Sequence, residues 1–496
     1  MMLLQSLADN TAEFAVNDGD QSIDFPALVQ RANRVYSYLK AQGIGSEHHV
    51  AMMLDNRIEN IEIMLAVLMS GAWLTPINWH LTRPEIDYII DDSGAELLFY
   101  QDCFCDQIDL DKLAQLVNLD SDYSTIITQP VTHSASADDP AGGMMIYTSG
   151  TTGYPKGVKR AKAATLGQLF AAFRSGGSNV GLDGNGVHLV TGPMYHAAPA
   201  LYALYDLLNG TSLYLMQRFD VLSALALIER YKVTHSHWVP TMFVRLLKLP
   251  KAQRQGFDTS SLTLVLHGAA PITPSIKQQM LDEWGDVLVE YWGGTEGGVT
   301  TIINSQQWRD HPGSVGKALP QFEVFAIDHD DQRLPPGQPG LLYAKHQSLG
   351  RVFEYHNAKQ KTDQAHLVDG AFTLGDMGYV DEQGYVYLSD RRSNLIISGG
   401  VNIYPAEIEG VLIEHPDISD IGVFGVDDEE WGQSVVAVIE PSATADIDDL
   451  ADDLPLFCQS RLAKYKIPKV FHIIEKLPRT PAGKLYIRRI KDQFGG

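Results

Sequence analysis

Short apolar runs and longer amphipathic segments alternate along most of the chain. The runs at 48–54, 73–77 and 96–100 have the length and apolar character of buried strands, and they are separated by segments at 56–71 and 83–92 in which apolar residues recur at helical spacing. Strands that alternate with helices of this length are typical of βαβ units. The first part of the chain is therefore predicted to form a doubly wound, mostly parallel sheet.

The same alternation returns between 191 and 291, where a helix is expected over 221–231, and it predicts a second doubly wound sheet. From 321 to 388 the pattern changes to short strands separated by turns rich in Pro and Gly, which favours hairpins and a small β-barrel subdomain. The predicted fold is thus α/β, with two doubly wound sheets and a small barrel in a large N-terminal domain.

Composition narrows the class of protein. The 496 residues carry 38 Lys and Arg against 61 Asp and Glu, a net charge of −23 that argues against non-specific nucleic-acid binding. Three cysteines rule out a disulfide framework and favour a reducing compartment. The first residues lack a basic secretory signal, and the longest apolar stretch is too short to cross a bilayer. We expect a soluble cytoplasmic protein, with peripheral membrane contact and a homodimer left open.

The total charge hides an asymmetry near the C-terminus. Residues 394–460 contain fifteen Asp or Glu and no Lys or Arg, whereas residues 461–496 contain ten Lys or Arg and two Asp or Glu. An acidic solvated face beside a basic helix explains this pattern. Delivery of the basic segment to a polyanionic ligand explains it equally well.

The most informative segment is MMIYTSGTTGYPKGV, residues 144–158. An apolar strand leads into a loop of Gly, Ser and Thr with a lysine near its end. Such a loop can offer backbone N–H groups, hydroxyls and one cation to a polyphosphate. It is not a Walker A loop, because the GK[ST] ending is absent.

This string resembles the signature loop of the AMP-forming acyl-adenylate superfamily, which includes acyl-CoA synthetases, adenylation domains of peptide synthetases and luciferases. The resemblance implies a phosphate-binding role for seven loop residues. They are Thr148, Ser149, Gly150, Thr151, Thr152, Gly153 and Lys156.

Further segments resemble the motifs that follow in this superfamily, in the same order. PMYHAAPA places His196 at the acyl and adenylate site, and HGAAP places Gly268, Ala269 and Ala270 beside the adenine. EYWGGTEGG resembles the YGxTE motif, which implies that Thr295 contacts a phosphate and that Glu296 holds Mg²⁺ on ATP. In the same segment Tyr291 is assigned to the adenine site, and Trp292, where tyrosine is usual, is expected to stack on the base.

The C-terminal motifs complete the series. The resemblance assigns the ribose hydroxyls to Asp376, the ribose and phosphates to Arg391, and the interdomain hinge to Ser393, which replaces the usual Asp or Lys. It also assigns the pantetheine arm of coenzyme A to Ser398, Gly399 and Gly400. The adenylation step is assigned to Lys484, in LPRTPAGKLYIRRI.

The resemblance covers essentially the whole chain and implies two domains. Residues 1–392 would bind ATP and the acyl substrate, and residues 393–496 would form a small mobile α+β domain that carries the catalytic lysine and serves the coenzyme A step. The implied reaction is ATP-dependent, with Mg²⁺ and coenzyme A, and proceeds through an acyl-adenylate to acyl-CoA, AMP and pyrophosphate.

The acyl group is less tightly specified. Candidate pocket residues at His237, Trp238, Val239 and Met242 are not charged, which favours an uncharged acid, most simply a medium- or long-chain fatty acid. A short-chain or steroid-type carboxylate stays open, as does transfer to a separate carrier protein. A zinc site at His235 and His237 lacks further ligands in the sequence, and no GxSxG or GxGxxG motif supports a hydrolase or a dehydrogenase.

Overall fold

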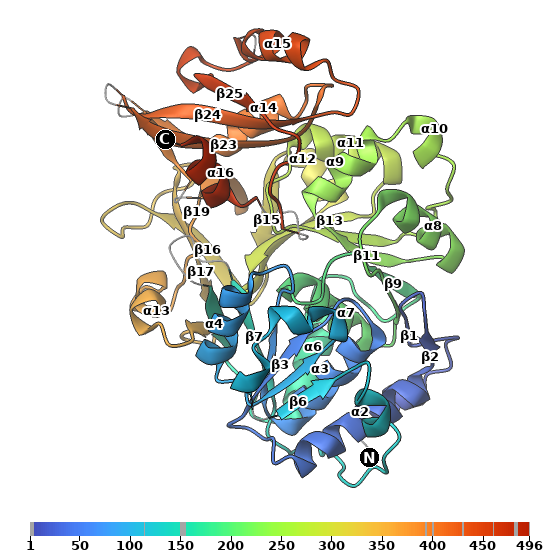
Figure 1. The fold of residues 1–496 in the computed structure, drawn as a ribbon. Coiled ribbons are helices and arrows are strands. Elements are labelled where there is room, and N and C mark those ends of the chain that lie inside the picture. Colours follow the sequence, from blue (N-terminus) through green and yellow to red (C-terminus); the bar gives the residue numbers. More distant parts are fainter. Residues whose placement is uncertain are drawn as a thin grey trace.

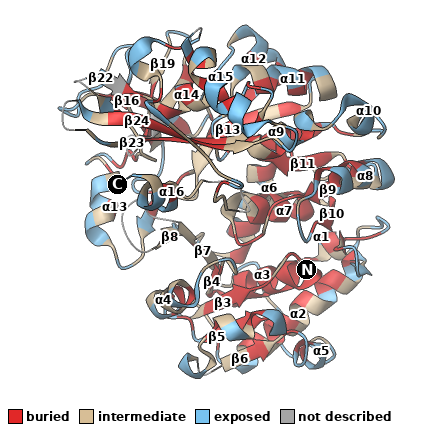
Figure 2. Ribbon diagram, turned by 45° about the horizontal axis from the view of Figure 1, so that its top comes forward, coloured by how far each residue is buried: buried red, intermediate tan, exposed pale blue. Residues whose placement is uncertain are grey.

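The computed structural model describes residues 4–113, 115–148, 155–391, 394–398, 401–428, 431–459, 461–480 and 485–495, apart from the side chains at 390, 391, 402 and 488. A large N-terminal domain of mixed sheets and helices carries a smaller C-terminal domain on one side (Figure 1). Buried residues concentrate in the sheets and on the inner faces of the helices (Figure 2). The predicted α/β class with two unequal domains is confirmed.

The first sheet has seven strands in the order β18-β8-β7-β4-β3-β5-β6. Strands β3 to β7 run parallel, and β8 and β18 continue the sheet in antiparallel pairing. The bounds are β3 His49–Met53, β4 Trp73–Pro76, β5 Leu97–Tyr100, β6 Gln115–Asn118, β7 Gly143–Thr148, β8 Lys156–Arg160 and β18 Phe353–Tyr355.

The second sheet has thirteen strands in the order β16-β17-β19-β20-β15-β14-β13-β12-β11-β9-β10-β1-β2. Its centre, from β13 to β10, is parallel. The bounds are β1 Val16–Asn17, β2 Ser22–Ile23, β9 Val187–Val190, β10 Ser212–Leu215, β11 His235–Trp238, β12 Leu264–His267, β13 Leu288–Gly294, β14 Gly298–Asn304, β15 Ser314–Ala318, β16 Phe322–Ile327, β17 Gly340–His346, β19 Asp376–Val380 and β20 Tyr385–Arg391.

The strands predicted for a separate barrel are short and antiparallel, as their Pro/Gly turns indicate, but they divide between the two sheets. Strands β15, β16, β17, β19 and β20 extend the second sheet beyond β14. Strand β18 instead pairs with β8 of the first sheet. The antiparallel region thus connects the two sheets on one side of the molecule.

Helices cover the two sheets, and the predicted helical segments agree with the structure to within a few residues. The segment expected over 221–231 coincides with α8, whose N-cap Asp220 accepts a hydrogen bond from the Ser223 N–H. The bounds are α1 Gln5–Ala8, α2 Phe25–Ala41, α3 Ile58–Ser70, α4 Arg83–Ser93, α5 Tyr123–Ile126, α6 Leu166–Asn179, α7 Ala197–Asn209, α8 Val221–Tyr231, α9 Pro240–Lys248, α10 Lys251–Arg254, α11 Pro274–Trp284, α12 Ser305–Asp310 and α13 Lys359–Ala365.

The C-terminal domain is built on a three-stranded sheet in the order β23-β24-β25, with the small hairpin β21-β22 beside it. Leu412, Ile439 and Leu454 are fully buried in its core. The bounds are β21 Ile396–Ser398, β22 Val401–Ile403, α14 Pro405–Leu412, β23 Ile418–Asp428, β24 Gly432–Pro441, α15 Ile447–Gln459, β25 Val470–Ile473 and α16 Ile487–Phe494. The predicted boundary at 392/393 falls on residues outside those described.

Ion pairs join the acidic and basic segments of this domain. Lys466 bonds to Glu407 at 2.6 Å, Lys469 bonds to Asp428 at 2.8 Å, and Arg479 pairs with Asp420. Part of the basic segment is therefore neutralised within the fold. Within the described ranges, no helix combines the length and the apolar character needed to cross a membrane.

Candidate active site

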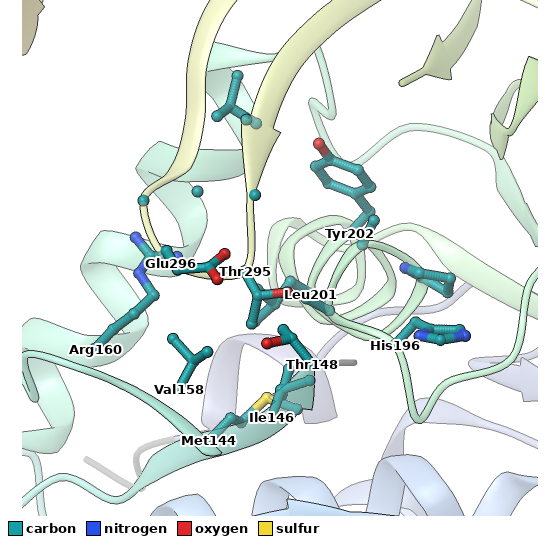
Figure 3. Close-up of a pocket in the computed structure, with 18 of the residues that line it drawn as sticks. Met144, Ile146, Thr148, Val158, Arg160, His196, Leu201, Tyr202, Thr295 and Glu296 are labelled. Carbon is teal, nitrogen blue, oxygen red and sulfur yellow. The ribbon is translucent and has the colours of Figure 1, made fainter. Parts of the chain in front are cut away.

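A cavity of about 970 Å³ lies where the carboxyl ends of the central strands of both sheets meet. Ligand sites in open α/β sheets form at this edge, because loops diverge there and leave a crevice. Figure 3 shows Thr148, Thr295 and Glu296 along one part of the wall, and His196, Leu201 and Tyr202 along another. Thr480 and Tyr486 of the C-terminal domain also line the cavity.

Two residues of the Gly/Ser/Thr segment are positioned by a β-hairpin. Thr148 ends β7 and Lys156 begins β8, and the two residues are directly paired across the strands. Both line the cavity. The other five predicted phosphate-binding residues, Ser149, Gly150, Thr151, Thr152 and Gly153, lie outside the described residues.

Glu296 lies in the turn between β13 and β14 and lines the cavity beside Thr295. The Tyr355 hydroxyl donates to Oε1 of Glu296 at 3.0 Å, and Lys156 Nζ lies 5.1 Å from the centre of the Tyr355 ring. Burial, and secondarily the neighbouring Lys361, lowers the pKa of Lys156 to about 8, with Glu296 opposing the shift. Tyr355 therefore joins the predicted acid and the predicted lysine into one group.

The start of α7 carries the predicted acyl-site histidine. His196 is the N-cap residue of α7, and it lines the cavity together with Ala197 and Ala198. Small side chains after the N-cap leave space in this part of the cavity. His237, Val239 and Met242 line the same cavity from β11 and the start of α9.

Trp238 does not share this position, which corrects the predicted acyl pocket. Successive side chains of a strand point to opposite faces, so Trp238 lies on the face of β11 away from His237. Its indole N–H donates to Ser236 at 3.0 Å, and its ring packs on Phe243 and Trp284 in the core beneath the sheet. Trp238 is fully buried.

Tyr291 and Trp292, both predicted for the adenine site, have different partners in the structure. Tyr291 lines the cavity, where its hydroxyl lies 3.0 Å from Nε2 of His237. The indole N–H of Trp292 donates to Oδ2 of Asp376 at 2.7 Å, and the side chain is buried. Trp292 therefore contacts the predicted ribose-binding acid.

The HGAAP segment turns sharply after β12. Ala269 has a positive φ of 65° and lines the cavity. Gly268 packs closely against Tyr291. A Cβ at position 268 would lie 2.7 Å from the Tyr291 carbonyl oxygen, so the position requires glycine. Ala270 follows at an intermediate level of burial.

Of the remaining predicted site residues, the described ones lie toward the C-terminal domain. The backbone of Arg391 pairs with Asp376 across β20 and β19, and Ser398 ends β21. Four other predicted residues lie outside the described residues, namely Ser393, Gly399, Gly400 and Lys484. Thr480 and Tyr486, which precede and follow Lys484 in the sequence, both line the cavity.

Several cavity residues were missed from the sequence. Tyr355 and Tyr202 belong to no motif, and Arg160 lies just beyond the Gly/Ser/Thr segment. The position of Tyr355 depends on strand pairing, since β18 brings it opposite Val158 of β8. Lys162 and Glu85 also line the cavity, so its wall as a whole carries charge, in contrast to the predicted pocket residues.

The two histidines of β11 have separate partners. Nδ1 of His235 lies 2.8 Å from Oδ2 of Asp206, whereas His237 contacts Tyr291. Across the described ranges, no three His, Cys, Asp or Glu side chains are grouped to hold a metal.

Two family models match the chain over most of its length. Residues 5–353 match the AMP-binding enzyme model, and residues 407–484 match the model of the AMP-binding enzyme C-terminal domain. The chain belongs to the AMP-binding enzyme family.

Relatives of this AMP-binding enzyme cover nearly its whole length. A fatty acid–[acyl-carrier-protein] ligase of Streptomyces coeruleorubidus is 32% identical, with 96% of this chain and 92% of that protein covered. A feruloyl-CoA synthase of Amycolatopsis is 30% identical, with 97% and 96% covered. The o-succinylbenzoate coenzyme A synthetase of Bacillus subtilis, solved in complex with ATP and magnesium ion, has a TM-score of 0.83 at 29% identity, with 99% of both chains covered.

These comparisons show an adenylate-forming enzyme of the acid–thiol ligase class. The acids named for the relatives range from fatty acids to succinylbenzoate and ferulate, so family membership does not determine the acid. In this AMP-binding enzyme the residues facing the cavity fit an ATP-bound Mg²⁺. Glu296 supplies one carboxylate, and Mg²⁺ in nucleotide sites is commonly held by one or two carboxylates together with substrate phosphates.

Proposed function

We propose that this AMP-binding enzyme is an ATP-dependent carboxylate–CoA ligase. It converts a carboxylic acid whose acyl chain is uncharged into its acyl-CoA through an acyl-adenylate. The observation that carries the proposal is the shared cavity. Thr148, Lys156 and Glu296 of the large domain line it, and so do Thr480 and Tyr486 on either side of the predicted lysine. Both displacements require the two domains to contribute to one site.

In the first displacement the acid carboxylate attacks the α-phosphorus of ATP, and pyrophosphate leaves. Positioning and charge neutralisation supply most of the catalysis in such transfers. Lys484 would hold the carboxylate and the α-phosphate together, since two anions otherwise repel each other. Lys156, Thr148 and Thr295 would hold the departing phosphates, and Asp376 and Arg391 would bind the ribose.

Mg²⁺, bound through ATP to Glu296, would neutralise charge on the phosphates. The Tyr355 hydroxyl donates to Oε1 of Glu296 and thereby fixes the direction of the carboxylate. A second oxygen, Oε2, is then available to face the cavity. This arrangement supports the assignment of Glu296 rather than another acid of the cavity wall.

In the second displacement the thiol of coenzyme A attacks the acyl carbonyl, and AMP leaves. We propose that the domain of residues 393–496 turns about Ser393 relative to residues 1–392, so that Lys484 withdraws and the segment 398–400 guides the pantetheine arm. No covalent protein intermediate is required. A small hinge residue can absorb the backbone rotation.

The proposal also covers the identity of the acid. The sequence favours a medium- or long-chain fatty acid, and the apolar side chains of Leu169, Phe173 and Leu201 line the cavity, where they would contact its alkyl chain. Short-chain and steroid-type acids share this chemistry. The name of the Streptomyces relative supports a second acceptor, a separate acyl-carrier protein, in place of coenzyme A.

The proposal is tested by incubating the full-length protein with ATP, Mg²⁺ and a panel of carboxylic acids, with and without coenzyme A. AMP release and the mass of the thioester are measured. We expect AMP and an acyl-CoA that depend on one class of acid. Adenylate formation with transfer only to a carrier protein would support the alternative acceptor, and no acid-dependent AMP would reject the ligase assignment.

A further inference from the structure

Three buried polar side chains meet in the acyl part of the cavity. Tyr202 comes from α7, His237 from β11 and Tyr291 from β13, and all three line the cavity. Their exposed fractions are 3%, 4% and 6%. Three separate elements therefore bring polar groups to one place in the cavity wall.

These side chains form a polar cluster. Tyr291 Oη lies 3.0 Å from Nε2 of His237. The Tyr202 ring contacts both residues, with centroids 5.3 Å apart for Tyr202 and His237 and 5.5 Å apart for Tyr202 and Tyr291. Tyr202 therefore packs against both partners of this hydrogen bond.

His237 is uncharged in this environment. Burial, and secondarily the neighbouring His188, lowers its pKa to about 3. The cluster is therefore neutral, and it offers hydrogen bonds without a net charge. It suits an uncharged polar group and gives no compensation for a buried carboxylate or ammonium.

The Tyr202 hydroxyl can donate one hydrogen bond and accept two. It can therefore present either lone pairs or its proton to the cavity. A hydroxyl group matches both cases, since it donates and accepts. A substrate that ends in an alkyl or unsubstituted aryl group would displace water from this position. It would replace none of the hydrogen bonds that the water makes.

The approach to the polar cluster is apolar and partly aromatic. Phe173, Leu201 and Tyr205 line the same cavity. The rings of Phe173 and Tyr205 meet edge to face with centroids 5.1 Å apart, and Tyr205 lies 6.3 Å from Tyr202. The wall thus fits an apolar acyl body that leads to the hydroxyl-binding group.

We propose that the acyl pocket selects acids whose apolar body ends in a hydroxyl group, which Tyr202 binds with support from Tyr291 and His237. This inference rests on the proposed ligase function and narrows its substrate class. Phenolic acids and terminally hydroxylated fatty acids carry the same group at the end remote from the carboxylate.

The test uses two matched pairs of acids with the full-length protein, 4-hydroxycinnamate with cinnamate and 10-hydroxydecanoate with decanoate. The kcat/KM of acyl-CoA formation is measured for each. We expect one hydroxylated acid to exceed its partner by about 10²-fold or more, as in sites built to bind a substrate hydroxyl. The pair that shows this ratio distinguishes an aromatic from an alkyl body.

Tyr202→Phe should bring this ratio to about threefold or less and leave the KM for ATP unchanged, because it removes one hydroxyl and keeps the ring. Tyr291→Phe, which removes the hydrogen bond to His237, is a second variant should the first fail to fold. Tyr214→Phe removes the hydroxyl of a buried tyrosine outside the cavity and should keep the wild-type ratio.

Equal use of both members of each pair by the wild-type protein would overturn the inference while leaving the ligase function intact. So would a Tyr202→Phe variant that keeps the preference. If no acid supports AMP release, the proposed ligase function is rejected, but hydroxyl selection by the pocket can still be tested. For this purpose, calorimetry measures the binding of the same acid pairs in the presence of AMP. Tighter binding of a hydroxylated acid would then support hydroxyl selection, and equal binding would reject it.

Discussion

The indole N–H of Trp292 donates to Oδ2 of Asp376 across 2.7 Å, with both side chains buried. The two residues lie in different strands of the second sheet, β13 and β19. A carboxylate held by a directed donor keeps one orientation. Trp292 therefore positions the acid that is proposed to bind the ribose hydroxyls.

Replacing Trp292 by Phe should weaken ATP binding more than it slows the chemistry. Loss of a hydrogen bond to a charged group costs about 1.5 kcal/mol, so we expect the KM for ATP to rise about tenfold. Steady-state kinetics with varied ATP measure the effect, and kcat should change by less than about threefold. Trp308→Phe makes the same chemical change in the buried core and should leave the KM for ATP as in wild type. An unchanged KM in Trp292→Phe would show that the contact does not position Asp376.

Lys484→Ala should separate the two half-reactions. The lysine is proposed to act only while the carboxylate attacks ATP, so acid-dependent exchange of pyrophosphate into ATP should fall by about 10² to 10⁴. Thioester formation from a supplied acyl-adenylate should stay close to the wild-type rate. Lys476→Ala, which removes a lysine of the same basic segment outside the motif, serves as the control. Equal loss of both half-reactions in Lys484→Ala would reject the assignment.

Local patterns in the sequence predicted most elements, because helices and strands of this fold bury one face or both. The segment 83–92 illustrates this: Ile86, Ile89 and Ile90 are buried on one side of α4, and Gly94 ends the helix with a φ of 65°. The antiparallel strands were also predicted, but their division between two sheets was not. Pairing of β18 with β8 joins residues nearly two hundred positions apart, and no local pattern encodes it.

The site could be predicted only as far as its motifs extend. Thr148, Lys156, Thr295 and Glu296 meet in one cavity as the ordered motifs imply. Trp238 was misplaced, although the alternation of side chains in the strand 235–238 already separates it from His237. The contact of Trp292 spans 84 positions, so the sequence indicated an indole near the nucleotide but not its partner.

Glu296→Gln should raise the concentration of Mg²⁺ required for half-maximal activity. The amide keeps the size of the side chain and removes the charge that would hold the ATP-bound ion. Adenylate formation at fixed ATP and varied Mg²⁺ measures the shift, which we expect to be about tenfold. Glu354→Gln changes an exposed acid of the neighbouring strand β18 and should leave the requirement unchanged. A Mg²⁺ dependence identical to wild type in Glu296→Gln would contradict the proposed role.

Glu62 should make the folded protein less stable as the pH rises from about 4.5 to about 7. Its carboxylate is fully buried in α3, where Tyr123 donates to it at 2.6 Å and Arg31 Nε lies 2.7 Å away. Burial raises the pKa of Glu62 to about 7, and Arg31 and Tyr123 only partly oppose the shift. Between these pH values the folded state binds the proton more tightly than the unfolded state, so stability falls with rising pH, by an amount on the order of 3 kcal/mol.

Glu62→Gln should remove this part of the pH dependence when thermal midpoints are compared with wild type from pH 4.5 to 8. Glu13→Gln, which changes an exposed acid of the same domain, should keep it. Parallel pH profiles for wild type and Glu62→Gln would show that Glu62 keeps an ordinary pKa in the folded protein.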